Sequence, residues 1–351
     1  MTILVTGAAG FIGSNFVLNW LNKNEETIIN LDSLTYAGNL ENLKSIENST
    51  KYKFFQGDIG DSKLVSFILG EYKPRAILHF AAESHVDRSL HDPDSFIQTN
   101  IIGTYRLLEE ARFFYNKLKE KDKNRFRFLH VSTDEVYGSL NSADLAFKET
   151  NKYYPNSPYS ASKASSDHLV RAWSCTYGLP VLTTNCSNNY GPYQFPEKLI
   201  PLCILKALQG HNLPIYGDGQ QVRDWLYVLD HCNGIINVLE TGSIGETYNI
   251  GGWNERTNLE VVHSLCDLLD ELSPRVDGGF YKEQITFVKD RPGHDYRYAI
   301  DSTKISNALG WKPIDTFESG IRKTIQWYLD NQEWVAHVQS GEYQGWLSKN
   351  Y

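Results

Sequence analysis

The chain has 351 residues and carries 34 Lys and Arg against 42 Asp and Glu, a formal net charge of −8. This balance argues against a nucleic-acid-binding protein, because counterion release from phosphate backbones rewards a basic surface. Small anionic ligands remain open, because two or three cations in a pocket are enough to bind them. The length and the 41% hydrophobic content predict a sizeable core in one large or two modest domains.

Cysteine usage and the distribution of apolar residues indicate the compartment. The cysteines are odd in number and form no CxxC pair, so we expect a reduced, cytoplasmic environment. They are Cys175, Cys186, Cys203, Cys232 and Cys266. The first residues carry no basic leader, and no apolar run reaches the roughly eighteen residues that span a bilayer. We therefore expect neither export nor membrane insertion.

The first half alternates short β-branched runs with amphipathic segments, as in a parallel sheet with helices on both faces. Strands are expected at residues 3–5, 27–31, 52–55, 76–80, 127–131 and 181–184. Helices are expected at residues 11–21, 94–113 and 159–177, and the basic stretch 117–127 as a solvated loop. We predict an α/β fold built on a Rossmann-like, doubly wound parallel sheet.

Gly7, Gly10 and Gly13 stand at GxxGxxG spacing between the first expected strand and the first helix. Small residues let the backbone approach a pyrophosphate, whose charge then faces the free N–H groups of the helix N-terminus. Asp32 follows 19 residues after Gly13, where a carboxylate accepts from both ribose hydroxyls and repels a 2′-phosphate. The strand and helix around the turn argue against a ligand-free turn, and the pattern predicts NAD rather than NADP.

Later strand ends offer further cofactor contacts. Asp58 follows the third strand and either accepts from an adenine amino group or caps the helix that starts near Ser62, two equally supported alternatives. Phe80, Ala81 and Ala82 end the fourth strand with mostly small residues that suit a backbone lying against a cofactor. Asn100 is assigned a structural role, bonding a neighbouring backbone.

Tyr159 and Lys163 stand at i and i+4 on one helix face. An ordinary Tyr is a poor base at neutral pH, but positive charge from Lys163 and oxidised nicotinamide would favour the phenolate. A surface helix can carry this pair by chance, yet Ser132 and Thr133 at a strand end supply a hydroxyl for a substrate. With the glycine turn, these residues resemble the extended short-chain dehydrogenase/reductase superfamily.

Asp134 and Glu135 follow Thr133 directly, at the carboxyl end of a parallel strand, where ligands bind in such sheets. Hydride transfer alone does not need two acids. An elimination does, because one group removes a proton from carbon while another protonates the departing hydroxyl. The alternative is a loop with two solvated acids, which we rank second.

After about Asn185 the sequence becomes rich in Gly, Pro and aromatic residues, as in loops and short elements that close over a ligand. We expect residues 1–187 to form the NAD-binding Rossmann domain, with some later segments returning to it. Residues 188–351 are expected to form most of a smaller, interleaved α/β domain that binds the substrate.

Five stretches extend the resemblance to one family. Residues 34–40, 81–87, 133–135, 159–163 and 290–295 resemble the dTDP-glucose 4,6-dehydratases, and the likeness runs through nearly the whole chain. The Thr-Asp-Glu run together with YxxxK is its most discriminating part. Ala8 departs from the family, which more often has glycine there, but it is not one of the spaced glycines.

The resemblance implies a reaction. Tyr159, with Thr133 and Lys163, takes the proton of the glucose 4-hydroxyl while hydride leaves C4 for NAD. Glu135 then removes the C5 hydrogen and protonated Asp134 assists loss of the C6 hydroxyl. Hydride returns to C6, so NAD is regenerated each turnover and is expected to be tightly held.

The cofactor-binding residues implied are Gly7, Gly10, Phe11, Ile12, Gly13, Asp32, Ser33, Leu34, Thr35, Asp58, Ile59, Phe80, Ala81, Ala82, Ser84, Thr99, Tyr159, Lys163 and Asn189. The substrate-binding residues implied are Ser84, Thr133, Asn188, Lys198, Leu199, Pro214, Ile215, Tyr216, Arg223, Asn258, Asp290, Arg291 and His294. Lys198 and Arg223 are assigned to the diphosphate, and the alternative for Arg223 is an ion pair with Asp224 or Asp230. His85 and His294 lack further ligands at metal-binding spacing, so we expect no metal.

Other functions share part of this pattern. A nucleotide-sugar 4-epimerase needs the glycine turn, Tyr159 and Lys163 but not the acid pair, whereas a UDP-glucose 4,6-dehydratase needs all of them. An NAD-binding regulator without catalysis would not need the four reactive side chains. The family also implies a homodimer through the helices at 94–113 and 159–177, although their apolar faces would equally fit a monomer core. The 4-keto-6-deoxy product would serve dTDP-rhamnose or another deoxysugar pathway.

Overall fold

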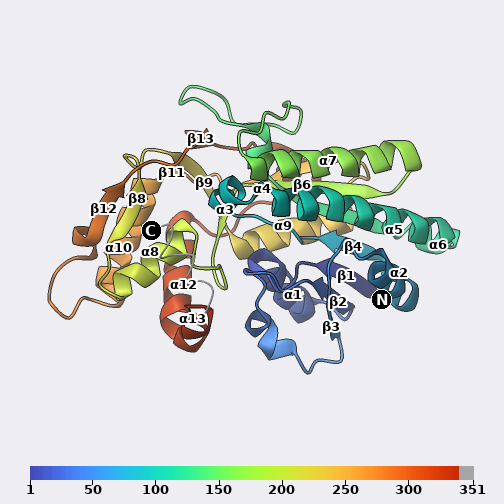
Figure 1. Ribbon diagram of the computed structural model, residues 1–351, viewed down its shortest axis with the longest axis horizontal. Coiled ribbons are helices and arrows are strands. Elements are labelled where there is room, and N and C mark those ends of the chain that lie inside the picture. Colours follow the sequence, from blue (N-terminus) through green and yellow to red (C-terminus); the bar gives the residue numbers. More distant parts are fainter. Residues whose placement is uncertain (340–351) are drawn as a thin grey trace.

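The computed structural model describes residues 1–339, and its largest feature is a seven-stranded parallel sheet in the order β10-β6-β5-β4-β1-β2-β3 (Figure 1). Its strands are β1 Thr2–Thr6, β2 Thr27–Asp32, β3 Tyr52–Gln56, β4 Ala76–His79, β5 Arg127–Thr133, β6 Val181–Cys186 and β10 Thr247–Ile250. The order reverses beside β1, and such a switch point opens a crevice at the carboxyl ends of the strands. The predicted Rossmann-like sheet is confirmed.

Both faces of this sheet are covered by helices, and successive side chains of each strand point to opposite faces and are buried there. Ile3 and Val5 pack with α1 and α9 on one face, while Leu4 packs with α2, α5 and α7 on the other. The helices are α1 Phe11–Lys23, α2 Ser62–Tyr72, α5 Thr104–Lys117, α7 Pro158–Tyr177, α9 Val228–Thr241 and α11 Thr303–Leu309. Continuous apolar strands are what a sheet covered on both faces requires.

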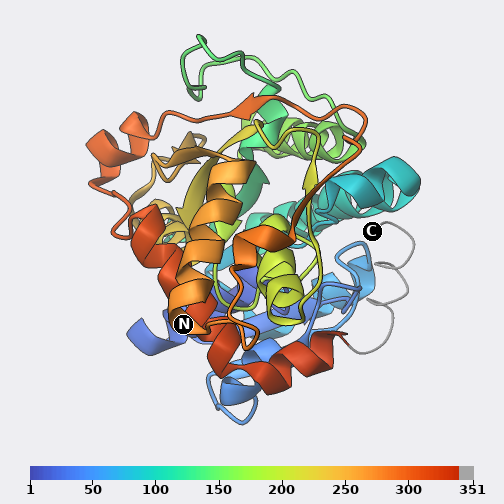
Figure 2. The same cartoon turned by 90° about the vertical axis from the view of Figure 1, so that its left-hand side faces the viewer.

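A smaller lobe lies at one end of the molecule and faces the viewer in Figure 2. Its strands are β7 Asn188–Tyr190, β8 Leu213–Tyr216, β9 Val222–Tyr227, β11 Glu255–Thr257, β12 Ile285–Val288 and β13 Arg297–Tyr298. Its helices are α8 Leu199–Leu208, α10 Asn258–Leu272, the 3-10 helix η4 Tyr281–Gln284, α12 Phe317–Asp330 and α13 Gln332–Gln339. The chain is interleaved, because α9 and β10 lie on the large sheet although they follow β9 in sequence.

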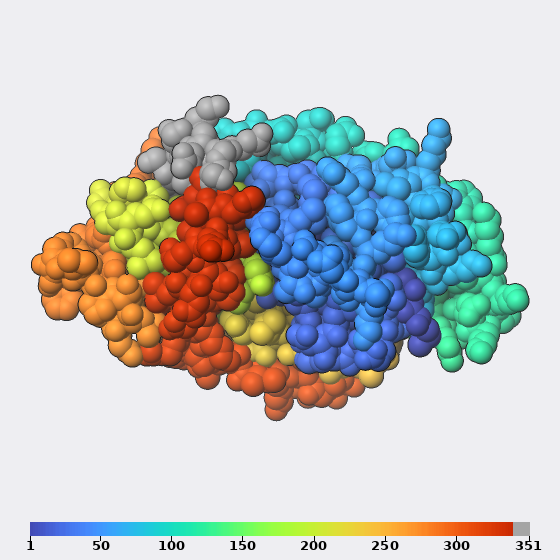
Figure 3. Space-filling view, turned by 90° about the horizontal axis from the view of Figure 1, so that it is seen from below, coloured from blue at the N-terminus to red at the C-terminus, as the bar shows by residue number. Residues whose placement is uncertain are grey.

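The last helix joins the two halves. Figure 3 shows the red C-terminal segment lying against the blue N-terminal half. Trp334 of α13 donates its indole N–H to Asn42 Oδ1 at 2.7 Å, in the 3-10 helix η1 Leu40–Ile46. None of the helices in residues 1–339 is long and apolar enough to cross a membrane.

The helix expected at 94–113 is interrupted. The structure has α3 Val86–His91, α4 Pro93–Phe96, a π-helical turn η2 Ile97–Gly103 and only then α5. Inside η2, Asn100 receives the Glu83 N–H at 2.9 Å and donates to the Glu83 carbonyl at 3.0 Å, which confirms its structural role. Such wide turns are frequent beside functional sites. In the basic stretch 117–127, most residues before Phe126 are exposed and include a short helix, α6 Glu120–Lys123, whereas Phe126 is buried and Arg127 begins β5.

Candidate active site

A cavity of about 400 Å³ lies at the carboxyl ends of β1, β2, β4, β5 and β6, between the large sheet and the smaller lobe. It is lined by nearly all of the predicted cofactor-binding and substrate-binding residues. Leu34 and Asp290 are the exceptions. Leu34 instead donates its backbone N–H to Asp32 at 2.9 Å, and Asp290 accepts from His294 at 2.6 Å. These two residues therefore support site residues rather than line the cavity.

The glycine turn leaves space that side chains would fill. A Cβ on Gly7 would lie 2.6 Å from the Ala81 backbone, and one on Gly13 would lie 2.4 Å from the Gly7 carbonyl oxygen. Gly7 also has a φ of +72°, in the region that favours glycine. Helix α1 begins after Gly10 without a side-chain cap. The open helix N-terminus and the bare backbone beside it fit the pyrophosphate of a dinucleotide.

Two carboxylates flank the adenosine side of the cavity. Asp32 ends β2 and accepts the Ala9 N–H at 2.8 Å, which fixes the carboxylate beside the glycine turn. Burial raises the pKa of Asp32, and the backbone N–H groups of Leu34 and Ala9 lower it. Asp58 lines the cavity and accepts from Gly60, whereas the cap of α2 is Asp61. The capping alternative for Asp58 is therefore wrong.

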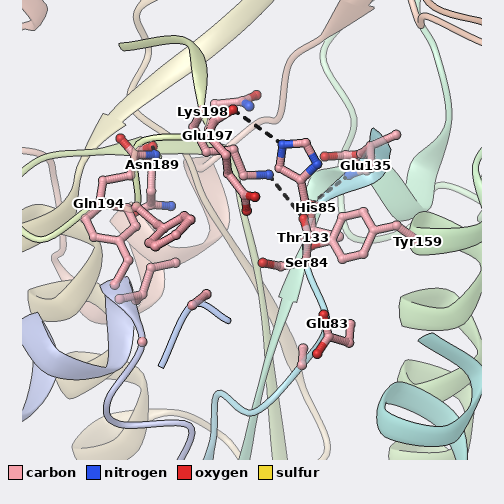
Figure 4. Close-up of a pocket in the computed structure, with 18 of the residues that line it drawn as sticks. Glu83, Ser84, His85, Thr133, Glu135, Tyr159, Asn189, Gln194, Glu197 and Lys198 are labelled. Atoms are coloured by element: carbon pink, nitrogen blue, oxygen red, sulfur yellow. Dashed lines mark hydrogen bonds between the residues drawn. The ribbon is translucent and has the colours of Figure 1, made fainter. Parts of the chain in front are cut away.

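The predicted reactive residues come from β5 and α7. Thr133 ends β5, and Asp134 and Glu135 begin the 3-10 helix η3 Asp134–Tyr137. Tyr159 lies in the first turn of α7, which is fixed by a capping box between Ser157 and Ser160 and by Pro158. Figure 4 shows Glu135, Thr133 and Tyr159 gathered around His85.

The two acids have different surroundings. The pKa of Asp134 is held well above its usual range, by burial first and then by the charges of Glu135 and Asp224. Its Oδ2 atom has no hydrogen-bond partner among the described residues. Burial also raises the pKa of Glu135, but Lys198, Arg291 and Arg223 act against that rise. Asp134 is thus suited to keep a proton and Glu135 to lose one.

The phenolate expected at Tyr159 is not favoured by its protein surroundings. Its pKa is raised well above the usual value, by burial first and by Glu135 second. Lys163 is itself buried, which lowers its pKa, and its ammonium donates to the Val131 carbonyl at 2.9 Å. Burial therefore outweighs the expected effect of Lys163 on the phenol.

Three cations lie on the substrate side of the cavity. Lys198 donates to the Ser84 carbonyl at 3.2 Å, and Arg291 forms an ion pair with Asp87 at 3.0 Å. Arg223 is buried, with its guanidinium 4.4 Å from the Tyr298 ring centre.

The guanidinium of Arg223 donates to backbone carbonyls, including that of Asp295 at 2.9 Å. The carboxylates of Asp224 and Asp230 accept backbone N–H groups instead, at 2.8 Å from Gly252 and 2.9 Å from Asp315. The alternative that paired Arg223 with one of these two acids is therefore wrong.

Comparison with known proteins agrees with this geometry. Residues 4–324 match a family model described as GDP-mannose 4,6 dehydratase. A dTDP-glucose 4,6-dehydratase of Salmonella typhimurium is 60% identical across all of this chain and 99% of its own length. One from Escherichia coli K12 is 58% identical with the same coverage. The chain belongs to the dTDP-glucose 4,6-dehydratase family.

Solved structures give the same relationship. A dTDP-glucose 4,6-dehydratase from Bacillus anthracis, in complex with NAD, is 47% identical with a TM-score of 0.85 and covers 96% of this chain and 99% of its own. A UDP-glucose 4-epimerase from Thermotoga maritima is 30% identical with a TM-score of 0.82, over 95% of this chain and all of its own. Dehydratases and epimerases thus share this fold, and the side chains in the cavity must separate them.

Several cavity residues of this dehydratase family member were not predicted from the sequence. They include Glu83, His85, Asp87, Cys186, Gln194, Glu197 and Tyr298. Glu197 pairs with Arg88 at 3.0 Å, and the Arg88 guanidinium lies 3.6 Å from the Tyr36 ring centre. Cys186 lies opposite Thr133 in the β5–β6 register, so strand ends paired in register would have revealed it. The others come from loops, from α3 (Asp87) and from β13 (Tyr298), and where these segments meet depends on the whole fold.

Proposed function

We propose that the chain is an NAD-dependent hydro-lyase that converts dTDP-glucose to dTDP-4-keto-6-deoxyglucose and water. The observation that carries this proposal is the acid pair of buried Asp134 and half-buried Glu135, at the end of the strand that faces Tyr159 and Lys163. The 60% identity to a dTDP-glucose 4,6-dehydratase over the full chain supports the substrate.

The residues around the glycine turn fit NAD. Gly7, Gly10 and Gly13 would hold the pyrophosphate against the N-terminus of α1, and Asp32 would bind the adenine ribose. When bound, NAD supplies the means of removing hydride from C4 of the sugar and of returning it to C6. The carboxylate of Asp32 excludes a 2′-phosphate at the same place.

The first proton movement belongs to Tyr159. Its phenolic oxygen, as the phenolate, accepts the proton of the substrate 4-hydroxyl. The Thr133 hydroxyl, at the end of β5, hydrogen-bonds to the same substrate oxygen. Burial opposes the phenolate form of Tyr159, and the positive charges of Lys163, one helical turn away, and of bound oxidised nicotinamide would act against that effect. Oxidation at C4 makes the C5 hydrogen acidic, because the resulting carbonyl stabilises negative charge at the neighbouring carbon.

The elimination belongs to the acid pair. Glu135 removes the C5 proton, and Asp134 donates its proton to the departing C6 hydroxyl through Oδ2, to which no residue within 1–339 hydrogen-bonds. The raised pKa of Asp134 favours the protonated form that this step needs. After hydride returns to C6, Glu135 gives its proton back to C5.

The smaller lobe holds the nucleotide part of the substrate. Lys198 and Arg223 bind the diphosphate, and Arg291 adds positive charge to the same wall. Pro214, Ile215 and Tyr216 of β8 give this wall an apolar surface for the base and sugar. Local cations of this kind allow an anionic ligand to bind a chain with a net charge of −8.

The proposed enzyme acts as a homodimer in the cytoplasm. Exposed apolar side chains gather on η2, α5 and the end of α7, which run parallel beside each other, and they offer a surface for a second copy. They are Ile97, Ile102, Tyr105, Phe113 and Tyr177. The four buried thiols without disulfides suit a reducing compartment.

The decisive experiment incubates purified protein with dTDP-glucose, UDP-glucose and GDP-mannose and identifies the products by mass spectrometry and NMR. We expect loss of one water without net NADH, fastest on dTDP-glucose. A C4 epimer of unchanged mass would indicate a 4-epimerase instead. Faster loss of water from UDP-glucose would indicate a UDP-glucose 4,6-dehydratase. Binding of NAD without turnover of any sugar would identify a regulator.

A further inference from the structure

A buried polar cluster lies behind the reactive residues, on the side of β5 that faces α7. It consists of His130, Val131 and Ser132 from β5 and of Lys163, Ser166 and Asp167 from α7. Lys163 donates to the carbonyl of Val131 at 2.9 Å. Asp167 lies one helical turn further on, and the mechanism above gives it no role.

Both carboxylate oxygens of Asp167 form hydrogen bonds with residues of β5. Oδ1 lies 3.1 Å from His130 Nε2, and Oδ2 accepts the Ser132 hydroxyl at 3.0 Å. These two partners flank Val131, whose carbonyl receives Lys163. Asp167 therefore fixes the strand residues on either side of the carbonyl that holds the ammonium.

The cluster also balances charge. Lys163 is 4% exposed and Asp167 is 5% exposed, so both groups are removed from water. A buried ammonium without a partner loses its proton, because desolvation disfavours the charged form. Burial lowers the pKa of Lys163, and the charge of Asp167 is the main influence that raises it again. The i and i+4 spacing places the two groups on one helix face.

The other titratable groups around the pair are neutral. Burial lowers the pKa of His79 and His130, which face the pair from β4 and β5. Burial raises the pKa of Tyr137 and Tyr153, which approach Asp167 from η3 and the loop before α7. Cys186 faces Lys163 from β6, and burial raises the pKa of its thiol as well.

The remaining acids nearby face the cavity. Asp134 keeps its proton because its pKa is raised, and Glu135 is directed toward Tyr159 and the cations of the smaller lobe. Within residues 1–339, Asp167 is thus the acid placed to compensate Lys163 from the protein interior.

We propose that Asp167 is the counter-ion of Lys163, a positioning residue that keeps the ammonium charged and fixed one turn from Tyr159. This inference rests on the proposed function, since the charge of Lys163 matters through proton transfer at Tyr159. Asp167 does not touch the substrate or the cofactor. It acts through Lys163 and through the strand that both residues hold.

The test is Asp167→Asn, which keeps the shape of the side chain and removes its charge. Lys163 should then lose its proton at lower pH, so activity should fall earlier as pH rises. We expect the alkaline limb of kcat/KM for dTDP-glucose to move down by about one pH unit or more, the size expected for loss of a nearby opposite charge. A purely structural role would lower kcat/KM without moving this limb.

Two variants serve as controls. Ser166→Ala removes a buried hydroxyl from the same helix turn without changing charge, and it should keep the parent's alkaline limb. Asp167→Glu keeps the charge, so the pH at which its kcat/KM falls in the alkaline range should lie close to that of the parent. An unmoved limb in Asp167→Asn overturns the inference but leaves the proposed function intact, whereas absence of dehydration by the parent chain overturns the proposed function itself.

Unfolding gives a second readout that needs no turnover. If Asp167→Asn is too unstable to assay, the double variant Asp167→Asn with Lys163→Met should melt at a higher temperature than Asp167→Asn, because no buried cation is left without a partner. A double variant that melts no higher than Asp167→Asn would contradict the counter-ion role.

Discussion

The two walls of the cavity recognise their ligands in different ways. The cofactor wall is built from backbone and small residues, with Gly7, Gly10 and Gly13 at a helix N-terminus and with Asp32, which we propose binds the ribose. The substrate wall is built from charged and aromatic side chains of distant segments, among them Lys198. A backbone site depends on one local turn, whereas a side-chain site depends on where several loops meet.

The difference predicts how each wall tolerates change. Adding a single carbon to the cofactor wall should damage binding, because the backbone cannot move away. Removing a single charge from the substrate wall should have a graded effect, because neighbouring cations share the task. The acid pair between the walls should affect chemistry more than binding.

The largest effect is expected at that acid pair. Asp134→Asn and Glu135→Gln should slow water loss by roughly 10²–10⁴-fold, the range typical of a lost general acid or base. Oxidation at C4 should remain largely intact, so NADH should accumulate transiently in a rapid-mixing absorbance measurement. If both variants release water at the parent's rate, the acid pair has been wrongly assigned.

A smaller effect is expected at the cofactor wall. Gly13→Ala places a carbon about 2.4 Å from the Gly7 carbonyl oxygen and should weaken NAD binding by roughly 10- to 100-fold. Calorimetric titration with NAD measures the change. Gly70→Ala is the matched control, because a Cβ at Gly70 meets nothing within 4 Å, and it should bind NAD as the parent does.

A smaller mutational effect still is expected at the substrate wall. Lys198→Met removes one diphosphate cation and should raise KM for dTDP-glucose by roughly tenfold, the loss typical of one charge-assisted hydrogen bond. Its kcat should change less than KM, because Lys198 acts on the chemistry only through its charge on Glu135. Steady-state kinetics distinguish the two constants, with exposed Lys121 of α6, changed to Met, as the control. A fall in kcat with unchanged KM would place Lys198 in the chemistry instead.

The smallest effect concerns stability. The folded pKa of Asp134 lies above its unfolded value, so its contribution to stability is complete at low pH and is lost as pH rises toward the folded pKa. Asp134→Asn avoids that loss and should raise Tm at neutral pH by roughly a few degrees. The gain should disappear in acid. If the difference in Tm between Asp134→Asn and the parent is the same at all pH values, ionisation of Asp134 does not destabilise the fold.

The sequence carried the local features of the site. The glycine spacing, Asp32 and the pair Tyr159 and Lys163 each lie within one turn or one helix, so their geometry follows from neighbouring residues. The interruption of the helix at 94–113 did not follow, because it accompanies hydrogen bonds between Asn100 and the distant loop at Glu83. Local periodicity contains no information about such a partner.

The sequence does not predict residues whose roles depend on contacts made only in the tertiary fold. Glu197 and Arg88 meet only because the loop before α8 comes together with α3, and Leu34 and Asp290 orient neighbours rather than line the cavity. The effect of Lys163 on Tyr159 was overestimated for a related reason. Desolvation depends on how much protein surrounds a group, which spacing along the chain does not reveal.

The position of β10 at the edge of the large sheet has a consequence for biosynthesis. Residues Thr247–Ile250 pair with β6, and α9 covers the sheet face formed by Ile3 and Val5. During translation, α1 can cover part of this face early, but the part under α9 stays uncovered until about two thirds of the chain has been made. Contacts between such distant segments slow folding and prolong exposure of apolar surface. We therefore expect the nascent chain to expose apolar surface for longer than a Rossmann domain encoded in one continuous stretch.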